Sequence, residues 1–315
     1  MSKTTAVSLS LKGDLLTGVE WSASQVQDFL RLAADVKAHP DRYRGTLDGK
    51  SLVLIFEKPS LRTRVTFEVA IAQLGGYSTF LDHTASRLGQ REPVRDIARN
   101  LERWVQGIVA RVFAQKTLDD LAKNATVPVI NALSDKYHPC QALADFFTLE
   151  ERFGGLRGLK FTYVGDGNNM CHSLLMTAAQ TGAHMRVATP EGYEPDGAIV
   201  SHAKRIAELT GGSVEILTSP QDAVRGAQAV YTDVWASMGQ EAEAATREAA
   251  FASYQVNEAL FSLAAPDAVF LHCLPAHRGL EVTDAVMDSS RSVVYDQAEN
   301  RLHVQKAILH SLLNS

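Results

Sequence analysis

The segment Ser60-Leu61-Arg62-Thr63-Arg64 holds residue types that together suit a phosphate. Its serine fits a helix N-cap, because apolar residues recur after it at helical spacing and Gly75-Gly76 ends the run. A helix that begins there would offer unsatisfied backbone N–H groups and the positive end of its dipole. The two arginines add permanent charges, and the threonine adds a hydroxyl. A capped helix with solvated arginines would look similar, but Pro59 and the preceding apolar stretch favour an anion site.

Apolar stretches that predict strands recur along the chain and alternate with amphipathic helical stretches. This alternation is typical of an α/β protein whose mostly parallel sheets are flanked by helices. The predicted strands are Leu52–Phe56, Ile108–Val112, Val127–Ile130, Leu159–Val164, Met185–Ala188, Val214–Leu217, Ala229–Thr232 and Ala268–His272.

Unusual polar residues follow several of these strands. Besides the Ser60 segment they are Arg111, His138-Pro139-Cys140-Gln141, Gly165-Asp166-Gly167-Asn168-Asn169, Asp233 and Cys273. In open parallel sheets, ligands bind outside the carboxyl ends of the strands. Because these clusters are shared between the two halves of the chain, we expect an active site in a cleft between two domains.

The domain division is expected near the middle of the chain, since 315 residues exceed the usual size of one hydrophobic core. The pattern predicts a helix over Gln141–Phe153, after the last strand of one sheet and before the first strand of the next. We therefore predict a first domain over 1–145 and a second over 146–297. A further strand is predicted at Ser292–Tyr295, and a C-terminal helix within 298–315 is expected to pack back on the first domain.

Composition narrows the kind of partner. The net charge of −5 gives no support for general binding to nucleic acids or membrane surfaces. Three cysteines are an odd and sparse number, which argues against a disulfide framework and for a reducing compartment. No stretch has the apolar length of a signal peptide or a membrane span. We expect a cytoplasmic protein that binds small molecules.

Three other patterns fit their usual chemistry poorly. Gly45 and Gly49-Lys50-Ser51 have three residues between the glycines where the phosphate-binding P-loop needs four, and they precede a strand. Gly165-Asp166-Gly167 lacks the third glycine of a dinucleotide fingerprint, since Met170 stands in its place. The stretch from His272 to His277 has no zinc spacing of the CxxC or HExxH kind, so we expect no metal.

The ordered set of motifs resembles the ornithine carbamoyltransferase family. The matching segments are Phe56–Arg64, His138–Gln141, Gly165–Asn169 with His172-Ser173, Asp233–Gly239, His272–Pro275 and Ala298–Arg301. They appear in the family's order and span nearly the whole chain. The Ser-Met-Gly loop and the His-Cys-Leu-Pro motif indicate ornithine, because relatives that use aspartate lack both and those that use putrescine differ at the loop.

The resemblance implies that the carbamoyl group of carbamoyl phosphate is transferred to the side-chain amine of L-ornithine, giving L-citrulline and phosphate without a cofactor or metal. The first domain would bind carbamoyl phosphate and the second ornithine. Residues implied for carbamoyl phosphate are Ser60, Leu61, Arg62, Thr63, Arg87, Arg111, His138, Gln141, Cys273, Leu274 and Arg301. Residues implied for ornithine are Asn169, Asp233, Ser237 and Met238. The implied catalytic set is Arg111, His138, Asp233 and Cys273, with either Asp233 or Cys273 accepting the amine's proton.

The resemblance also implies a homotrimer, or a multiple of trimers, in which the loop Arg87-Leu88-Gly89-Gln90 reaches a neighbouring subunit's active site. Two positions depart from the family. Leu61 replaces a frequent threonine and could contribute only its backbone N–H. Arg87 replaces a frequent glutamine or histidine; it would add a cation to the neighbour's phosphate site or be an ordinary solvated arginine. The segment Pro275–Gly279 resembles biosynthetic bacterial members and indicates arginine biosynthesis.

Two other functions stay open. One is a carbamoyltransferase for another amine, such as an N-acylornithine or putrescine, and the other is a catalytically silent regulatory relative. Asp233 with Ser237-Met238 favours a free amino acid as the acceptor. A silent relative is disfavoured because it has no chemical need for all four of the residues Arg111, His138, Asp233 and Cys273.

Overall fold

The computed structural model describes Val7, residues 9–236 and residues 241–314. The chain divides into two compact units. The first comprises Met1–Phe147 together with Glu299–Ser315, and the second comprises Thr148–Ala298. The helix α5 (Pro139–Phe153) contains the boundary between them.

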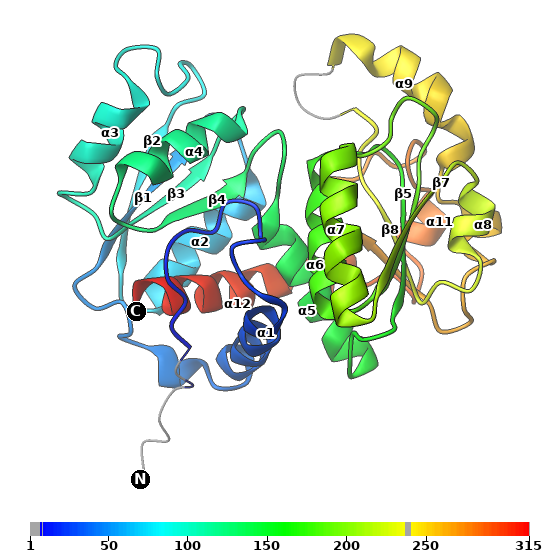
Figure 1. Cartoon of the computed structure of the whole chain (residues 1–315), viewed down its shortest axis with the longest axis horizontal. Coiled ribbons are helices and arrows are strands. Elements are labelled where there is room, and N and C mark those ends of the chain that lie inside the picture. Colours follow the sequence, from blue (N-terminus) through cyan, green and yellow to red (C-terminus); the bar gives the residue numbers. More distant parts are fainter. Residues whose placement is uncertain (1–6, 8, 237–240, 315) are drawn as a thin grey trace. The chain divides into compact units, whose positions relative to one another are not determined.

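The first unit is built on a four-stranded parallel sheet with the order β2-β1-β3-β4. Its strands are β1 (Ser51–Phe56), β2 (Tyr77–Asp82), β3 (Gly107–Arg111) and β4 (Val129–Leu133). Helices α3 (Val94–Leu101) and α4 (Gln115–Asn124) pack together over one face, and α2 (Leu61–Gln73) and α12 (Val294–Leu313) cover the other (Figure 1). Apolar side chains of β1 and β3 fill the core against α3 and α4.

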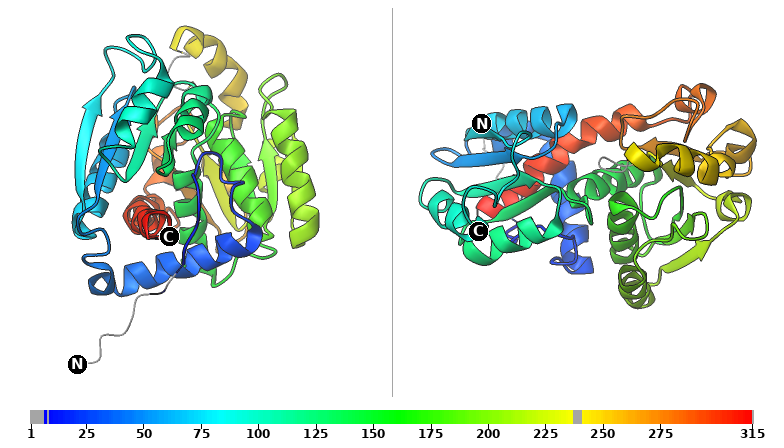
Figure 2. Two further views of the ribbon diagram at one scale, coloured as in Figure 1. Left: turned by 60° about the vertical axis from the view of Figure 1, so that its left-hand side comes forward. Right: turned by 90° about the horizontal axis from the view of Figure 1, so that it is seen from above.

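The C-terminal part of α12 lies in the first unit beside α1 (Ala23–Ala38), as Figure 2 shows in red and blue. The Lys37 ammonium donates to Asn300 Oδ1 over 2.8 Å, and Lys50 caps the far end of α12 by donating to the Leu313 carbonyl. These contacts join the C-terminal helix to residues near the start of the chain.

The second unit contains a five-stranded parallel sheet with the order β7-β6-β5-β8-β9. Its strands are β5 (Lys160–Val164), β6 (His184–Ala188), β7 (Ser213–Leu217), β8 (Ala229–Thr232) and β9 (Val269–His272). Helices α6 (Asn169–Thr181) and α7 (Gly197–Thr210) pack side by side on one face (Figure 1). The direction of progression through the sheet reverses after β7, so α8 (Pro220–Val224) covers the other face.

The predicted fold class, parallel sheets flanked by helices in two halves, is confirmed by this topology. The strand predicted at Ser292–Tyr295 is wrong. Ser292 makes one isolated bridge to Phe270, and α12 already begins at Val294. Buried Val293 and Val294 give a short apolar run, which periodicity alone cannot assign to a strand or a helix.

In the part of the chain that the structure describes, no helix is long and apolar enough to cross a membrane.

Candidate active site

The turn between β1 and α2 in the first unit has the geometry of an anion site. Ser60 is the N-cap of α2, and its side chain accepts a hydrogen bond from the Thr63 backbone N–H over 3.3 Å. Leu61 is the first helical residue and is 76% exposed, so its side chain points into solvent while its N–H lies at the positive helix end. Replacing the frequent threonine by leucine therefore removes a hydroxyl without burying a new apolar group.

A buried hydrogen-bond chain connects this turn to α12 and α5. The Arg301 guanidinium donates to Thr63 Oγ1 over 2.8 Å and to Gln141 Oε1 over 2.7 Å. The Gln141 amide in turn donates to Asp145 Oδ1 over 2.7 Å. The amide oxygen and the amide nitrogen of Gln141 can each make a second hydrogen bond, and the Thr63 hydroxyl can still donate its proton. The chain fixes the donors while leaving them able to contact a ligand.

Arg111 ends β3 at a register shift. Ala110 is opposite Asn131 of β4, but Arg111 is opposite Leu133, so β4 carries one extra residue, Ala132, which forms a bulge opposite the end of β3. Bulges are common next to active sites, where they re-aim a side chain or end the strand pairing. Arg111 is buried, and with Arg301 it is close enough to act electrostatically on His138. Burial, together with these two cations, lowers the pKa of His138 well below its usual value, so its imidazole is neutral at pH 7.

The chain order places this turn and Arg111 at the point where parallel-sheet enzymes bind ligands. In the order β2-β1-β3-β4, the chain leaves β1 in one direction and then returns past it to β3. The crevice between the carboxyl ends of β1 and β3 is therefore the topological switch point. Ser60 follows β1 and Arg111 ends β3, so both flank it.

Arg87 stacks on its own chain. Its guanidinium carbon lies 4.1 Å from the ring centroid of Phe113, and the Lys58 ammonium lies 4.4 Å from the same centroid. The buried Glu57 carboxylate accepts from the backbone N–H groups of Leu88 and Phe113, each over 2.8 Å, and so ties the loop that carries Arg87 to the end of β3. Arg87 is exposed, yet it is held by an aromatic platform.

A pocket of about 570 Å³ adjoins the anion turn. Its lining includes Lys58, Ser60, Leu61 and Arg64, with Phe80 and Asp82 of β2 on the other side. The Arg64 guanidinium stacks on Phe80 at 3.6 Å and also pairs with Glu68. Arg64 therefore forms part of the pocket wall.

In the second unit, the β5–α6 turn and the end of β8 are cross-linked. Asn168 is the N-cap of α6: its Oδ1 accepts from the N–H groups of Met170 and Cys171, and its Nδ2 donates to Asp233 Oδ2 over 2.9 Å. Its amide is thus used within the protein. Because β5 is followed by β6 on one side and β8 on the other, this place is again a switch point.

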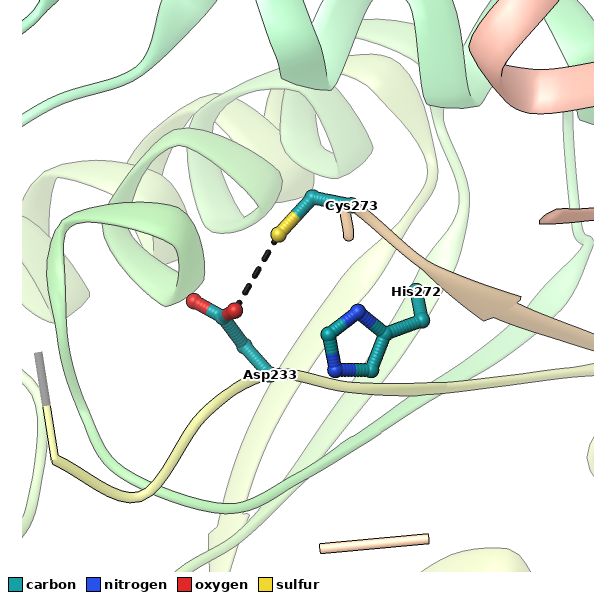
Figure 3. A group of neighbouring side chains, drawn as sticks. All are labelled: Asp233, His272 and Cys273. Carbon is teal, nitrogen blue, oxygen red and sulfur yellow. Dashed lines mark hydrogen bonds between the residues drawn. The ribbon is translucent and has the colours of Figure 1, made fainter. Parts of the chain in front are cut away.

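Cys273, at the end of β9, points toward Asp233 (Figure 3). Its thiol donates to Asp233 Oδ1 over 3.1 Å. Leu274 follows with a left-handed backbone, φ 59°, which is strained for a residue other than glycine. A hydrogen bond stabilises this conformation: the Leu274 N–H donates to His272 Nδ1 over 2.8 Å. Strained backbone of this kind clusters at ligand sites.

Asp233, His272 and Cys273 also lie close enough for a metal ion, with ligand atoms within 4.8 Å of one another. Both nitrogens of His272 are occupied, however: Nδ1 accepts from Leu274, and Nε2 lies 3.2 Å from the buried Glu281 carboxylate. Both oxygens of Asp233 also accept hydrogen bonds. These three side chains do not fit a metal site.

Family models match both units. Residues 13–151 match the carbamoyl-P binding domain of aspartate/ornithine carbamoyltransferase, and residues 157–312 match its Asp/Orn binding domain. The chain belongs to the aspartate/ornithine carbamoyltransferase family. The ornithine carbamoyltransferase of Thermococcus kodakarensis is 52% identical over 96% of each chain. The anabolic ornithine carbamoyltransferase of Pyrococcus furiosus is 52% identical over 96% of each chain, and a solved ornithine carbamoyltransferase structure from that organism has a TM-score of 0.94, with 50% identity over 98% of this chain and 99% of that one.

In this member of the carbamoyltransferase family, the residues implied by resemblance divide between the units. The first unit brings Thr63, Gln141 and Arg301 into one network, with Arg111 next to His138. The second unit brings Asp233 and Cys273 together and opens α6 at Asn169. Ser237 and Met238 lie outside the described residues.

Several residues that support the candidate site were not predicted from the sequence. They are Asp145, which accepts from Gln141; Glu57, which holds the Arg87 loop; Glu281, which pairs with His272; and Arg247, which is buried against Asp166. Asp145 lies four residues after Gln141 on a helix, so i, i+4 spacing could have found it. The others contact residues that are remote in sequence or lack any motif.

Gly167 gives a testable case of backbone approach in this turn. A Cβ at Gly167 would lie 2.2 Å from Pro195 N and 2.4 Å from the Glu194 carbonyl carbon, which are backbone atoms that cannot move aside. We expect Gly167→Ala to lower the free energy of unfolding by about 1–3 kcal/mol through overpacking. Thermal denaturation measures this. Gly197→Ala is the control, since nothing lies within 4 Å of its Cβ; equal melting temperatures for the two variants would contradict the expectation.

Proposed function

We propose that this chain is an ornithine carbamoyltransferase: it transfers the carbamoyl group of carbamoyl phosphate to the side-chain amine of L-ornithine, giving L-citrulline and phosphate. The observation that carries the proposal is the complementary chemistry of the two switch points. One gathers arginines, a helix N-terminus and a neutral histidine, which suit a phosphorylated carbonyl compound. The other gathers a carboxylate and a thiol, which suit an amine. Relatives that match nearly the whole chain are named ornithine carbamoyltransferase.

In this proposal the phosphate of carbamoyl phosphate binds at the N-terminus of α2. Ser60, Leu61, Arg62 and Thr63 would supply backbone and side-chain donors, with Arg301 behind Thr63. Arg111 would bridge the phosphate and the carbonyl oxygen. His138 and Gln141 would hold the carbamoyl group, and Cys273 with the carbonyl of strained Leu274 would complete its site.

Ornithine would bind at the second switch point through Asn169 and Asp233, with Ser237 and Met238 contributing from the segment that follows. The amine must be neutral to attack, while a free amine of the lysine type has a pKa of about 10. Asp233 Oδ1 accepts a hydrogen bond from the Cys273 thiol, so the two side chains that could receive the amine's proton lie side by side. Either residue would take the proton that the amine releases.

The proposed step forms a bond from the ornithine nitrogen to the carbonyl carbon and gives a tetrahedral centre whose oxygen is negative. Fixed donors at such an oxygen contribute about 10²–10³ in rate. The centre then collapses, the carbon–oxygen bond to phosphate breaks, and phosphate leaves with the electron pair. The nitrogen loses its proton to Asp233, or to Cys273 once the thiol has passed its own proton to Asp233. Holding both substrates also makes the reaction effectively unimolecular.

A panel of amines tests the proposal against a carbamoyltransferase of other specificity. Purified protein would be incubated with carbamoyl phosphate and L-ornithine, N-acetylornithine or putrescine, and ureido product and phosphate would be measured. We expect L-ornithine to give a kcat/KM at least about 10²-fold above the others. An analogue that lacks a hydrogen-bonding group of the substrate leaves polar groups of the site unpaired, and the site therefore rejects it. A preference for either alternative amine, or no product from any, would overturn the proposal.

Arg87 is proposed to add a cation to a neighbouring subunit's phosphate site. We expect Arg87→Ala to raise the KM for carbamoyl phosphate by roughly tenfold, the scale of one charge-assisted hydrogen bond, and to leave the KM for ornithine unchanged. Initial rates at varied carbamoyl phosphate measure this. Arg103→Ala is the control, because that side chain is 79% exposed in the same unit. An unchanged KM in Arg87→Ala would leave Arg87 as a surface arginine stacked on Phe113.

The remaining parts of the proposal concern assembly and setting. A homotrimer would cover the apolar Leu61 and Val65, which α2 exposes beside the pocket of about 570 Å³. A solution mass three times that of one chain would support it, and a monomer that retains full activity would contradict it. We further propose a cytoplasmic enzyme of arginine biosynthesis, in keeping with the relative from Pyrococcus furiosus that is named anabolic.

A further inference from the structure

Arg247 is an unusual residue of the second unit because its charge is buried. It lies on α9 (Ala244–Phe251) and is 7% exposed. Its Nη1 lies 3.0 Å from Asp166 Oδ2, a carboxylate that is itself 6% exposed. The same guanidinium donates to the Trp235 carbonyl oxygen over 3.0 Å. One side chain thus joins the β5–α6 turn to the backbone that follows β8.

Those two segments are the ones that carry the ornithine site. Asp166 stands two residues before Asn168, and Trp235 stands two residues after Asp233. Asn168 and Asp233 are already bonded directly over 2.9 Å. The bridge from Asp166 through Arg247 to Trp235 is therefore a second cross-link between the same segments, and the two cross-links together resist rotation of one segment against the other.

The surroundings of Arg247 hold it in one position. Its guanidinium carbon lies 5.1 Å from the Tyr193 ring centroid, and its Nε donates to Glu243 over 3.1 Å. Trp235 is stacked on Phe251 of the same helix, with ring centroids 5.9 Å apart and planes at 20°. A buried ion pair is a poor way to add stability, since desolvation of the charges offsets their attraction. Its position between the two segments that carry the proposed ornithine residues points to another role.

We infer that Arg247 is a positioning residue for the amine substrate: it fixes Asp233 and the start of α6 in the geometry that binds ornithine, without touching the substrate. This inference rests on the proposed function. Removing the guanidinium would free the Trp235 carbonyl and leave the Asp166 carboxylate buried without its cation. Burial raises the pKa of Asp166 to about 6 although Arg247 opposes the rise, and Asp233 is among the neighbouring charges that raise it further. An unpaired Asp166 would therefore disturb the electrostatics around Asp233 as well as the backbone.

The test separates the two substrates. In Arg247→Met we expect the KM for L-ornithine to rise by about tenfold to a hundredfold, the scale of lost hydrogen bonds to a charged group, while the KM for carbamoyl phosphate changes less than about twofold. Arg247→Lys, which keeps the charge but not the fork, is expected to fall between Arg247→Met and wild type. Arg186→Met is the matched control, because Arg186 pairs with Glu215 in the same unit while 42% exposed. It is expected to leave both constants unchanged.

A double-mutant cycle tests whether Arg247 and Asp166 act together, and melting curves test whether the variants are folded. If Arg247 and Asp166 act as a pair, Asp166→Asn alone raises the KM for ornithine, and adding it to Arg247→Met gives much less than the product of the two single effects. Circular dichroism melts would identify variants that are still folded at the assay temperature, and the comparison uses those. A folded Arg247→Met with an unchanged KM for ornithine, or one in which both KM values rise together, overturns the inference. Failure of the proposed function would look different, because wild-type protein would then make no citrulline.

Discussion

Arg111→Met is expected to lower kcat by about 10²–10³-fold with carbamoyl phosphate and ornithine both saturating. Arg111 is a buried cation at the end of β3, opposite the bulge in β4, near the proposed phosphate-binding turn and a neutral His138. In the proposed reaction it faces the oxygen on which negative charge develops, so its contribution grows in the transition state. A donor of this kind acts on kcat more than on ground-state binding. Initial-rate kinetics of citrulline release measure the effect.

Two companions make the Arg111 result interpretable. Arg111→Lys keeps the charge but loses the forked donor, so it should retain more activity than Arg111→Met while staying well below wild type. Arg103→Met, at a site that is 79% exposed in the same unit, should keep wild-type rates. If Arg111→Met changed only the KM for carbamoyl phosphate and left kcat intact, Arg111 would be a ground-state binding residue, and its place in the mechanism would be wrong.

Asp233→Asn is the second change with a large expected effect, a loss of about 10²–10⁴-fold in kcat/KM for ornithine, the range of a general base. The substitution preserves shape but removes the charge that accepts from Asn168 over 2.9 Å and from the Cys273 thiol over 3.1 Å. The new amide would also face the amide of Asn168. The KM for carbamoyl phosphate should stay close to wild type, because most of the proposed contacts to that substrate come from the first unit and none comes from Asp233.

Cys273→Ala distinguishes the two residues of this pair. If Asp233 accepts the amine's proton, Cys273→Ala removes an orienting thiol and should cost less activity than Asp233→Asn. If Cys273 accepts the proton, the order is reversed. Equal activity of wild type and Asp233→Asn would remove Asp233 from the mechanism altogether.

Much of the fold followed from the sequence because most strands are buried on both faces and are continuous apolar runs. Predicted strands such as Ala229–Thr232 match the structure, and Ser60 caps α2 as its pattern predicts. Strand β2 (Tyr77–Asp82) was not predicted, since it is an edge strand with alternate residues exposed and lacks an apolar run. The opposite error arose at Ser292–Tyr295, where buried valines begin a helix.

The side chains proposed to contact the substrates could be predicted because they follow the ends of strands. The contacts that hold those side chains in place could not. Arg301 was implied by the resemblance, but its contact with Thr63 spans 238 positions of sequence, and no local pattern predicts such a contact. In the sequence, Arg247 cannot be told from an ordinary solvated arginine on a helix. Only the packing of Tyr193 and Trp235 around it shows that its charge is buried. The sequence therefore predicted the side chains that could react better than the contacts that position those side chains.

The central claim is that the carbamoyl carbon passes from phosphate to the side-chain nitrogen of ornithine. The most direct measurement follows carbamoyl phosphate labelled with carbon-13 by NMR, in the presence of L-ornithine and the purified protein, with phosphate measured in parallel. The proposal requires the label to appear in the ureido carbon of citrulline, with one phosphate released for each citrulline, at a rate that Arg62→Ala greatly reduces. Label that appears only in bicarbonate or cyanate, or citrulline that forms equally fast with Arg62→Ala, would contradict the account.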